Sequence, residues 1–225
     1  MTENSSNKKR KKTPWPTKAA MEQVYEMKLW GDNQTTFYSG EGSHHPDFVN
    51  PYIKAVISFL KQHNSALQVC DLGCGDFNIG KQLVHYTSRY TGVDIVSDLI
   101  LHNKDTFRAD NLIFECLDLA VDELPHGDCA ILRQVLQHLS NSEIQNILNK
   151  LTMFKYVILT EHLPASHFSP NIDIISGQGI RLKNGSGVNI LEPPFKFKVK
   201  EVSLLASLPL KDGKSVIVTN CYTLF

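Results

Sequence analysis

The sequence has no long apolar run. No stretch of about eighteen consecutive apolar residues occurs in the 225-residue chain, so we expect no segment that spans a membrane. The opening residues also lack the basic, apolar and cleavage regions of a secretion signal. From both absences we expect a cytoplasmic protein with no membrane partner.

Cysteine is scarce and shows no paired spacing. The five thiols are odd in number and no C-x-x-C pattern occurs, which argues against a disulfide framework and against a zinc site. Four of the five fall on predicted strands, so we expect buried, reduced thiols and no bound metal. The residues are Cys70, Cys74, Cys116, Cys129 and Cys221.

The chain carries no net charge, because 23 Lys and Arg residues balance 23 Asp and Glu residues. The basic residues are unevenly spread. The run at 8–12 carries +5 and Glu3 carries −1, so the first twelve residues carry +4 and the rest −4. Such a tail binds nucleic acid in some proteins, but the remaining chain offers no basic stripe. We expect a disordered basic tail at 1–13 and no nucleic-acid partner.

Residues 14–225 show the alternation of strands and helices that is typical of one α/β domain. Their length and the 42% hydrophobic content of the chain suit a single core. The alternation predicts a doubly wound, mostly parallel sheet. Two helices before the first strand, at Thr17–Trp30 and Asn50–His63, should form an N-terminal helical cap over residues 14–63.

Two local patterns predict structure nearer the C-terminus. Ser140 and Glu143 have the spacing of a capping box, which predicts a helix through Leu151. The last two strands are expected at 197–202 and 216–225. The short connection between them predicts an antiparallel final hairpin.

A glycine-rich turn is the most informative segment. V-C-D-L-G-C-G-D-F-N-I-G (Val69–Gly80) follows a predicted strand and precedes a helix that we expect to start near Asn78. Gly73 and Gly75 permit backbone angles that a side chain disfavours, and they let a ligand lie against the main chain. The free amides at the start of the helix would then face that ligand. Such units bind nucleotides and nucleosides in open α/β sheets.

An NAD-dependent oxidoreductase would use such a unit. Its fingerprint requires a third glycine at position 78, where this chain has Asn78. The acid at the strand end, Asp71, would face a cation better than a pyrophosphate. Both features argue against NAD.

The D-L-G-C-G run resembles the first motif of class I S-adenosylmethionine (SAM)-dependent methyltransferases. Four later segments follow that family's order, and the resemblance covers Leu67–Leu163. It implies a seven-stranded, Rossmann-like fold with an antiparallel last strand. One departure is Phe77, which occupies the family's third glycine position. The segments resembling strands two to five are T-G-V-D-I (Thr91–Ile95), F-E-C-L-D-L (Phe114–Leu119), G-D-C-A-I-L-R-Q-V-L-Q-H-L (Gly127–Leu139) and Y-V-I-L-T-E-H-L (Tyr156–Leu163).

The resemblance implies SAM as the cofactor and gives roles to the strand ends. Asp71 would approach the methionine amino group, and Asp94 would bind the two ribose hydroxyls. Asp118 would accept from the adenine amino group, and Tyr38 in the loop Phe37–His45 would cover the methionine end. The predicted cofactor-binding residues are Tyr38, Asp71, Gly73, Gly75, Asp94, Ile95, Asp118, Leu119 and Gln134.

Methyl transfer from SAM is an in-line displacement, so the protein mainly aligns nucleophile, carbon and sulfur. A general base is needed only if the acceptor keeps its proton near neutral pH. His138 and Glu161, near predicted strand ends, are the candidates, although either could be purely structural. Residues 164–195 are too long for a plain connection and are predicted to be an acceptor-site insertion. The predicted acceptor contacts are Gln137, His162 and Arg181.

The neutral domain favours a small-molecule acceptor, and the sequence does not name it. Two alternatives to a methyltransferase stay open: the NAD-dependent oxidoreductase, and a SAM-binding regulatory module without catalytic activity. The intact strand-end acids favour a nucleoside site in either SAM-binding case, but they do not predict an acceptor pocket.

Overall fold

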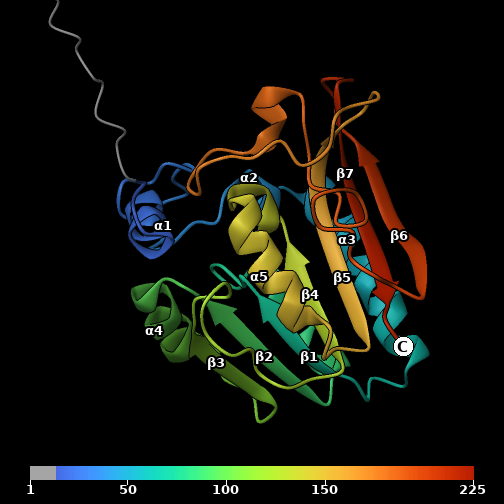
Figure 1. Ribbon diagram of the computed structural model, residues 1–225. Coiled ribbons are helices and arrows are strands. Elements are labelled where there is room, and N and C mark those ends of the chain that lie inside the picture. The colour runs from blue at the N-terminus through green and yellow to red at the C-terminus, as the bar shows by residue number, and fades with distance from the viewer. Residues whose placement is uncertain (1–13) are drawn as a thin grey trace, which may run out of the picture.

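The computed structural model describes residues 14–225, so the predicted basic tail lies outside the described residues. These residues form a seven-stranded sheet in the order β3-β2-β1-β4-β5-β7-β6 (Figure 1). β7 is the one strand of this sheet that runs antiparallel to the other six. The predicted fold class is confirmed. The strands are β1 (Gln68–Leu72), β2 (Arg89–Asp94), β3 (Leu112–Cys116), β4 (Cys129–Arg133), β5 (Tyr156–Pro164), β6 (Glu201–Pro209) and β7 (Ser215–Thr223).

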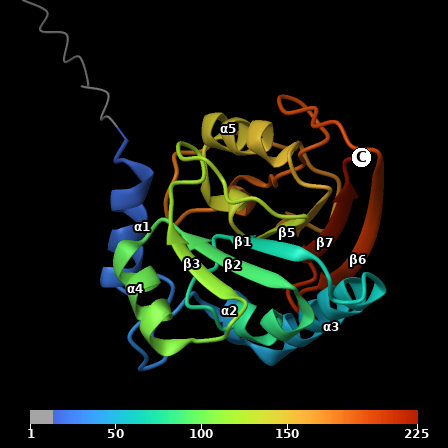
Figure 2. The same ribbon diagram turned by 90° about the horizontal axis from the view of Figure 1, so that it is seen from below.

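Helices cover both faces of the sheet, as Figure 2 shows for α5 and α3. Successive strand residues point to opposite faces, so Ile131 of β4 packs in the cluster with α3 and Leu132 packs in the cluster with α5. This alternation produces two hydrophobic cores, one on each face. The helices are α1 (Thr17–Glu26), α2 (Glu41–His44), α3 (Pro46–Gln62), α4 (Ser97–Thr106) and α5 (Asn141–Leu151).

The helix predicted to start near Asn78 is absent. Two short 3-10 turns, Gly80–Gln82 and Val84–Tyr86, stand in its place. The predicted start directly follows Phe77, whose left-handed φ of +61° cannot be part of a right-handed helix. The buried ring of Phe77 packs edge-on against Phe114 at 4.7 Å between centroids and lies directly against Gly80. The residue at the family's third glycine position, Phe77, therefore places its ring in the core.

The N-terminal helices differ from their predicted bounds. α1 ends at Glu26 rather than Trp30, because Lys28 takes a left-handed φ of +51°. Thr17 does not cap α1; its hydroxyl donates to the carboxylate of Glu143 instead. α3 begins four residues before Asn50, with Pro46 in its first turn and the ring of His45 accepting from the next amide.

The capping box and the final hairpin are confirmed, although β6 begins later than predicted, at Glu201. Four cysteines are buried as expected, but Cys116 is exposed at the end of β3, and all five are free. Within residues 14–225, no helix is long and apolar enough to cross a membrane. The same residues contain no cluster of His, Cys, Asp and Glu able to hold a metal ion.

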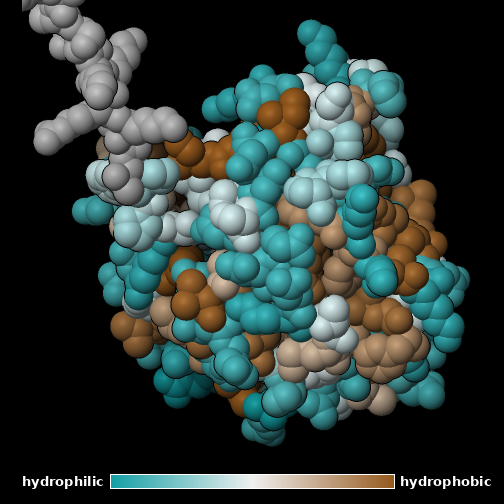
Figure 3. Space-filling view, viewed as in Figure 1, coloured by the Kyte–Doolittle hydropathy of each residue, from teal (hydrophilic) through white to brown (hydrophobic). Residues whose placement is uncertain are grey.

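Strand β6 forms one edge of the sheet. Its side chains Val202 and Leu204 are exposed, and the surface over β6 and β7 is largely apolar in the space-filling view (Figure 3). The opposite side of the molecule carries the N-terminal helix α1. The segment between β5 and β6 crosses from the sheet toward α1 (Figure 1). This crossing segment contributes residues to the wall of the site described below.

Candidate functional site

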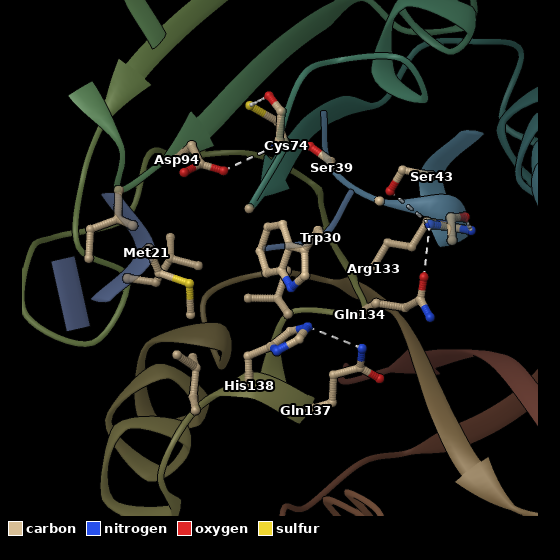
Figure 4. A pocket seen from close by; sticks show the side chains of 18 of the residues that line it. Met21, Trp30, Ser39, Ser43, Cys74, Asp94, Arg133, Gln134, Gln137 and His138 are labelled. Atoms are coloured by element: carbon tan, nitrogen blue, oxygen red, sulfur yellow. Dashed lines mark hydrogen bonds between the residues drawn. The ribbon is translucent and has the colours of Figure 1, made fainter. Parts of the chain in front are cut away.

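A cavity of about 480 Å³ lies beyond the carboxyl ends of β1, β2 and β4. Its volume falls within the range of roughly 300–1,000 Å³ that is typical of small-molecule sites. Residues from α1, α2, the strand ends and the segment between β5 and β6 contribute to its wall. Figure 4 shows Trp30 inside this wall, with Asp94 on one side and Arg133 on the other.

The glycine-rich turn forms the floor of the cavity. The amides of Gly73 and Cys74 both donate to the carbonyl of Val93 at 2.8 Å, which ties the turn to the end of β2. Gly73 and Gly75 have φ values of +89° and +56°, a region that favours glycine. A Cβ at Gly73 would also collide with Val135. The turn therefore requires glycine for both conformation and close packing.

Asp94 lies at the end of β2 and faces the cavity. Its two carboxylate oxygens accept from the amides of Gly75 and Val96, each at 3.1 Å. Burial raises its pKa, and these backbone bonds oppose that shift. A carboxylate oxygen has capacity for a second hydrogen bond, so Asp94 can still accept from a ligand.

Asp71 is the penultimate residue of β1 and is 5% exposed. It accepts a hydrogen bond from the hydroxyl of Tyr90 at 2.7 Å. Burial raises the pKa of Asp71 to about 6, while the Tyr90 hydrogen bond and the charge of Arg133 oppose the rise. A cation at this end of the cavity would keep Asp71 ionised.

The wall beside Asp94 is formed by residues that follow β2 and β3. Ile95 and Leu119 present apolar surface to the cavity, and Asp118 lies beside them. One oxygen of Asp118 accepts from the amide of Ala120 at 2.9 Å. This combination of apolar wall and carboxylate can hold a planar base that bears an amino group.

The turn after β4 brings Gln134, Gln137 and His138 to the cavity. Gln137 accepts from the amide of His162 through Oε1, so its Nε2 is free to donate to His138 Nε2 at 3.3 Å. His138 Nδ1 lies 3.2 Å from the carbonyl of Gly177 and must carry the proton, because a carbonyl only accepts. Burial lowers the pKa of His138 to about 4, so the ring is neutral at pH 7.

Four predicted site residues do not line the cavity. The ring of Tyr38 packs on His44 at 4.6 Å between centroids, outside the wall. Glu161 is 3% exposed and its carboxylate has no hydrogen-bond partner, and burial raises its pKa to about 8. His162 is also set behind the wall, with its Nε2 buried and unpartnered.

Arg181 is the fourth of these residues, and it is fully buried. Its guanidinium donates to the carbonyls of Leu136 at 3.2 Å and Leu139 at 2.7 Å, and to the side chain of Asn141 at 2.7 Å. The structure therefore puts Arg181 beneath the turn after β4, as a support for that turn, and not in contact with the cavity.

Two segments far apart in sequence roof the cavity. The side chain of Gln178, in the segment between β5 and β6, donates to the carbonyl of Leu29 at 2.7 Å. The carboxylate of Glu143 accepts from Thr17 of α1 and from Ser176, and so joins both roof segments to the start of α5. The predicted cap and the predicted insertion thus meet over the site.

Several wall residues were missed by sequence reasoning. Trp30 and Tyr25 come from the helical cap, and Ser39 forms a hydrogen bond with Tyr25 at 2.9 Å. No spacing rule connects such residues to the strand ends. The position of Arg133 in the sequence could have predicted it as a site residue, since it ends the fourth strand at the point where ligands bind in open sheets.

No family model and no curated protein sequence matches the chain. Solved structures do. The N-methyltransferase NodS of Bradyrhizobium japonicum WM9, in complex with S-adenosyl-L-homocysteine (SAH), aligns with a TM-score of 0.64 at 12% identity, covering 91% of this chain and 98% of NodS. The magnesium protoporphyrin IX methyltransferase ChlM of Synechocystis PCC 6803, with bound SAM, aligns with a TM-score of 0.56 at 16% identity, covering 93% and 99%.

Human N-acetylserotonin methyltransferase in complex with SAM also matches, with a TM-score of 0.57 at 16% identity, covering 93% of this chain and 60% of the human protein. All three identities are too low to transfer an activity, but the alignments extend over nearly the whole of this chain. Together with the strand order, they show that the chain has the fold of class I SAM-dependent methyltransferases.

Proposed function

We propose that the protein is a SAM-dependent methyltransferase that acts on a small-molecule acceptor. One observation carries the proposal: the acid next to the last residue of β1, the acid that ends β2 and the acid that follows β3 all line the same cavity, above a turn that requires glycine. An NAD-dependent oxidoreductase gains no support, because Asn78 occupies the position where its fingerprint needs a third glycine, and the acid Asp71 faces the end of the cavity where a pyrophosphate would lie.

The nucleoside end of SAM would lie against Asp94 and the wall beyond it. Asp94 would accept from the ribose hydroxyls, while Asp118 would accept from the adenine amino group. Ile95 and Leu119 would cover the faces of the base. The chemistry supplied by SAM is an activated methyl group, and the residues of the chain bind and orient it.

His138 is proposed as the proton acceptor. Its ring is neutral, and the lone pair of Nε2 is directed to the side-chain amide of Gln137 at the cavity wall. An acceptor hydroxyl that displaces this amide would meet the same lone pair, and would transfer its proton as the methyl group arrives. Trp30, whose ring centroid lies 5.3 Å from that of His138, would cover one side of the acceptor and exclude water.

The test measures SAH formation from SAM with a panel of small hydroxyl, amine and thiol compounds. Wild type should turn over at least one compound. His138→Asn should keep its affinity for SAH and lose roughly a hundredfold in turnover of a hydroxyl acceptor. The exposed His126 provides a matched control, since His126→Asn should retain full turnover. Tight SAM binding without turnover of any compound would instead favour the regulatory module.

A further inference from the structure

One lysine in the cavity wall has no ion partner. Among the described residues, the wall contains one arginine and one lysine, Arg133 and Lys183. Arg133 donates to the carbonyl of Gly42 at 2.6 Å and to the side chain of Gln134 at 3.2 Å, so its guanidinium joins α2 to the end of β4. Lys183 forms no ion pair within 4.0 Å with any residue of 14–225. Its ammonium is therefore available to a ligand.

The local fold directs Lys183 toward the cavity. Residues Arg181–Asn184 form a 3-10 helical turn, in which side chains three residues apart lie on the same side. Lys183 and Ile180, which directly precedes the turn, have this spacing, and both line the cavity. Arg181 lies on another side of the turn, where it is fully buried and donates to carbonyls of the turn after β4. This buried anchor fixes the rotation of the helical turn and holds the exposed Lys183 at the mouth of the cavity.

The segment that carries Lys183 also contacts His138. The amide of Gly177 donates to the carbonyl of His138 at 3.0 Å, and the carbonyl of Gly177 lies 3.2 Å from Nδ1 of the ring. The ring of Trp30 faces His138 at 5.3 Å between centroids (Figure 4), and Ile180 adds apolar surface between Gly177 and Lys183 in the sequence. This end of the cavity therefore presents a proton acceptor, an apolar wall and a cation.

The acids of the cavity wall leave Lys183 unpaired. Glu143 accepts from Thr17, from Ser176 and from the amide of Ser140 at 3.1 Å, so its carboxylate is engaged within the protein. The other acids of the wall are Glu41 of α2 and the three that the proposed function assigns to SAM. None of them lies within 4.0 Å of the Lys183 ammonium. An anionic ligand can therefore approach Lys183 without displacing a carboxylate of the protein.

We propose that the methyl acceptor is a hydroxy compound with an apolar body and an anionic group, and that Lys183 binds this anionic group. This inference rests on the proposed function, because it names the class of acceptor for the same site. The hydroxyl would meet Nε2 of His138, the body would lie along Trp30 and Ile180, and a carboxylate or phosphate would pair with the ammonium of Lys183.

The same arrangement accounts for every atom of the transfer. The acceptor oxygen would bond to the methyl carbon as the bond from that carbon to the sulfur of SAM breaks, and the hydroxyl proton would pass to Nε2 of His138. A methyl ether and SAH would leave, and His138 would release its proton to water. Lys183 touches none of these reacting atoms, so we expect it to affect KM for the acceptor and not kcat.

Two other roles for Lys183 predict different outcomes. If Lys183 is only a solvated surface lysine, its replacement should change neither SAH affinity nor the KM of any acceptor. If Lys183 contacts SAM, its replacement should weaken SAH binding. A role in binding the acceptor predicts unchanged SAH affinity and a KM effect that is restricted to anionic acceptors.

The test measures SAH formation with matched pairs of acceptors, one anionic and one neutral. The acids para-hydroxybenzoate, para-hydroxyphenylacetate and ω-hydroxyoctanoate are each compared with their carboxamides. The pair of para-hydroxyphenyl phosphate and hydroquinone distinguishes phosphate from carboxylate recognition. Wild type should turn over at least one of the anions, with a kcat/KM roughly fivefold or more above that of its neutral partner. This factor is modest because an exposed lysine pairs with an anion in surroundings of high dielectric constant.

Lys183→Met should raise the KM of that anion roughly fivefold, and change its kcat and the KM of the neutral partner by less than about twofold. Lys183→Arg should stay close to wild type because it keeps the charge. Added NaCl should raise the KM of the anion in wild type but not in Lys183→Met, because salt screens exposed charges. Lys104→Met, at an exposed position of α4 outside the cavity wall, is the matched control and should behave like wild type.

Equal turnover of the anionic and neutral partners would overturn the inference, as would a Lys183→Met effect that is the same for both. Calorimetric binding of SAH to the wild type without turnover of any anion would overturn it as well. Absence of SAH binding to the wild type would instead contradict the proposed function, so the two failures are distinguishable.

Discussion

Single carboxyl groups in this protein experience very different surroundings. Asp94 accepts hydrogen bonds from two backbone amides and faces the cavity, whereas Glu161 is buried behind the wall and its carboxylate accepts no well-formed hydrogen bond. Burial raises the pKa of Glu161 to about 8, and the charge of Arg181 and the nearby backbone amides of Leu136 and Gln137 only partly oppose the rise. This residue should therefore control how stability depends on pH.

The direction of this pH dependence follows from the pKa values of Glu161 in the folded and unfolded states. The ordinary pKa is 4.5, so between pH 4.5 and about 8 folded Glu161 keeps a proton that the unfolded chain releases. Stability of the wild type should then fall as pH rises across this interval. Glu161→Gln cannot ionise. Its melting temperature should exceed that of wild type by roughly 4 °C or more at pH 9 and by little at pH 4.5.

Glu26→Gln, at an exposed position that ends α1, supplies the control. Differential scanning calorimetry at several pH values would measure both variants. A Glu161→Gln difference that stays constant from pH 4.5 to pH 9 would mean that the folded protein does not hold this proton.

At the scale of elements, the turn after β4 depends on a buried arginine from another part of the chain. Arg181 donates to carbonyls of this turn and lies in the short helical turn Arg181–Asn184. Arg181→Met would leave buried carbonyls unpaired and would remove the positive charge near Glu161. We expect a loss of about 3 kcal/mol in the free energy of unfolding, measured by urea titration.

Lys183 lies in the same helical turn but is exposed, so Lys183→Met is the matched control and should shift stability by less than about 0.5 kcal/mol. If both variants unfolded at the same urea concentration as wild type, Arg181 would not support the turn. Retained SAH affinity in Arg181→Met under stabilising conditions would agree with its position behind the wall.

The elements also show which parts of the fold were readable from sequence. Parallel strands end at one edge of a sheet, so the acids at 71, 94 and 118 could be expected to meet, and all three line the cavity. The capping box at Ser140 was equally local, and it is present. Patterns within one element were sufficient in these cases.

Predictions that depended on distant partners were less successful. The absent helix after the glycine-rich turn reflects how Phe77 packs against β3, which no local propensity contains. Arg181 was expected at the acceptor, yet its partners lie more than forty residues earlier in the chain, in a turn that accepts its hydrogen bonds. Thr17 likewise donates to Glu143 rather than capping its own helix.

For the molecule as a whole, the cavity is enclosed by two segments that lie far apart in the sequence. α1 and α2 come before the first strand, and the segment bearing Ser176 and Gln178 follows the fifth. Glu143 joins them through Thr17 and Ser176. A ligand that fills the cavity should therefore stabilise the whole domain, because it contacts both roof segments and the carboxyl ends of the strands.

The most direct test of the central claim is a calorimetric titration of the wild type and of Asp94→Ala with SAH. We predict that wild type binds one SAH per chain and that Asp94→Ala, which loses an acceptor for the ribose hydroxyls while remaining folded, binds at least roughly tenfold more weakly. Equal affinity in the two proteins, or NAD binding to the wild type in place of SAH, would contradict the account.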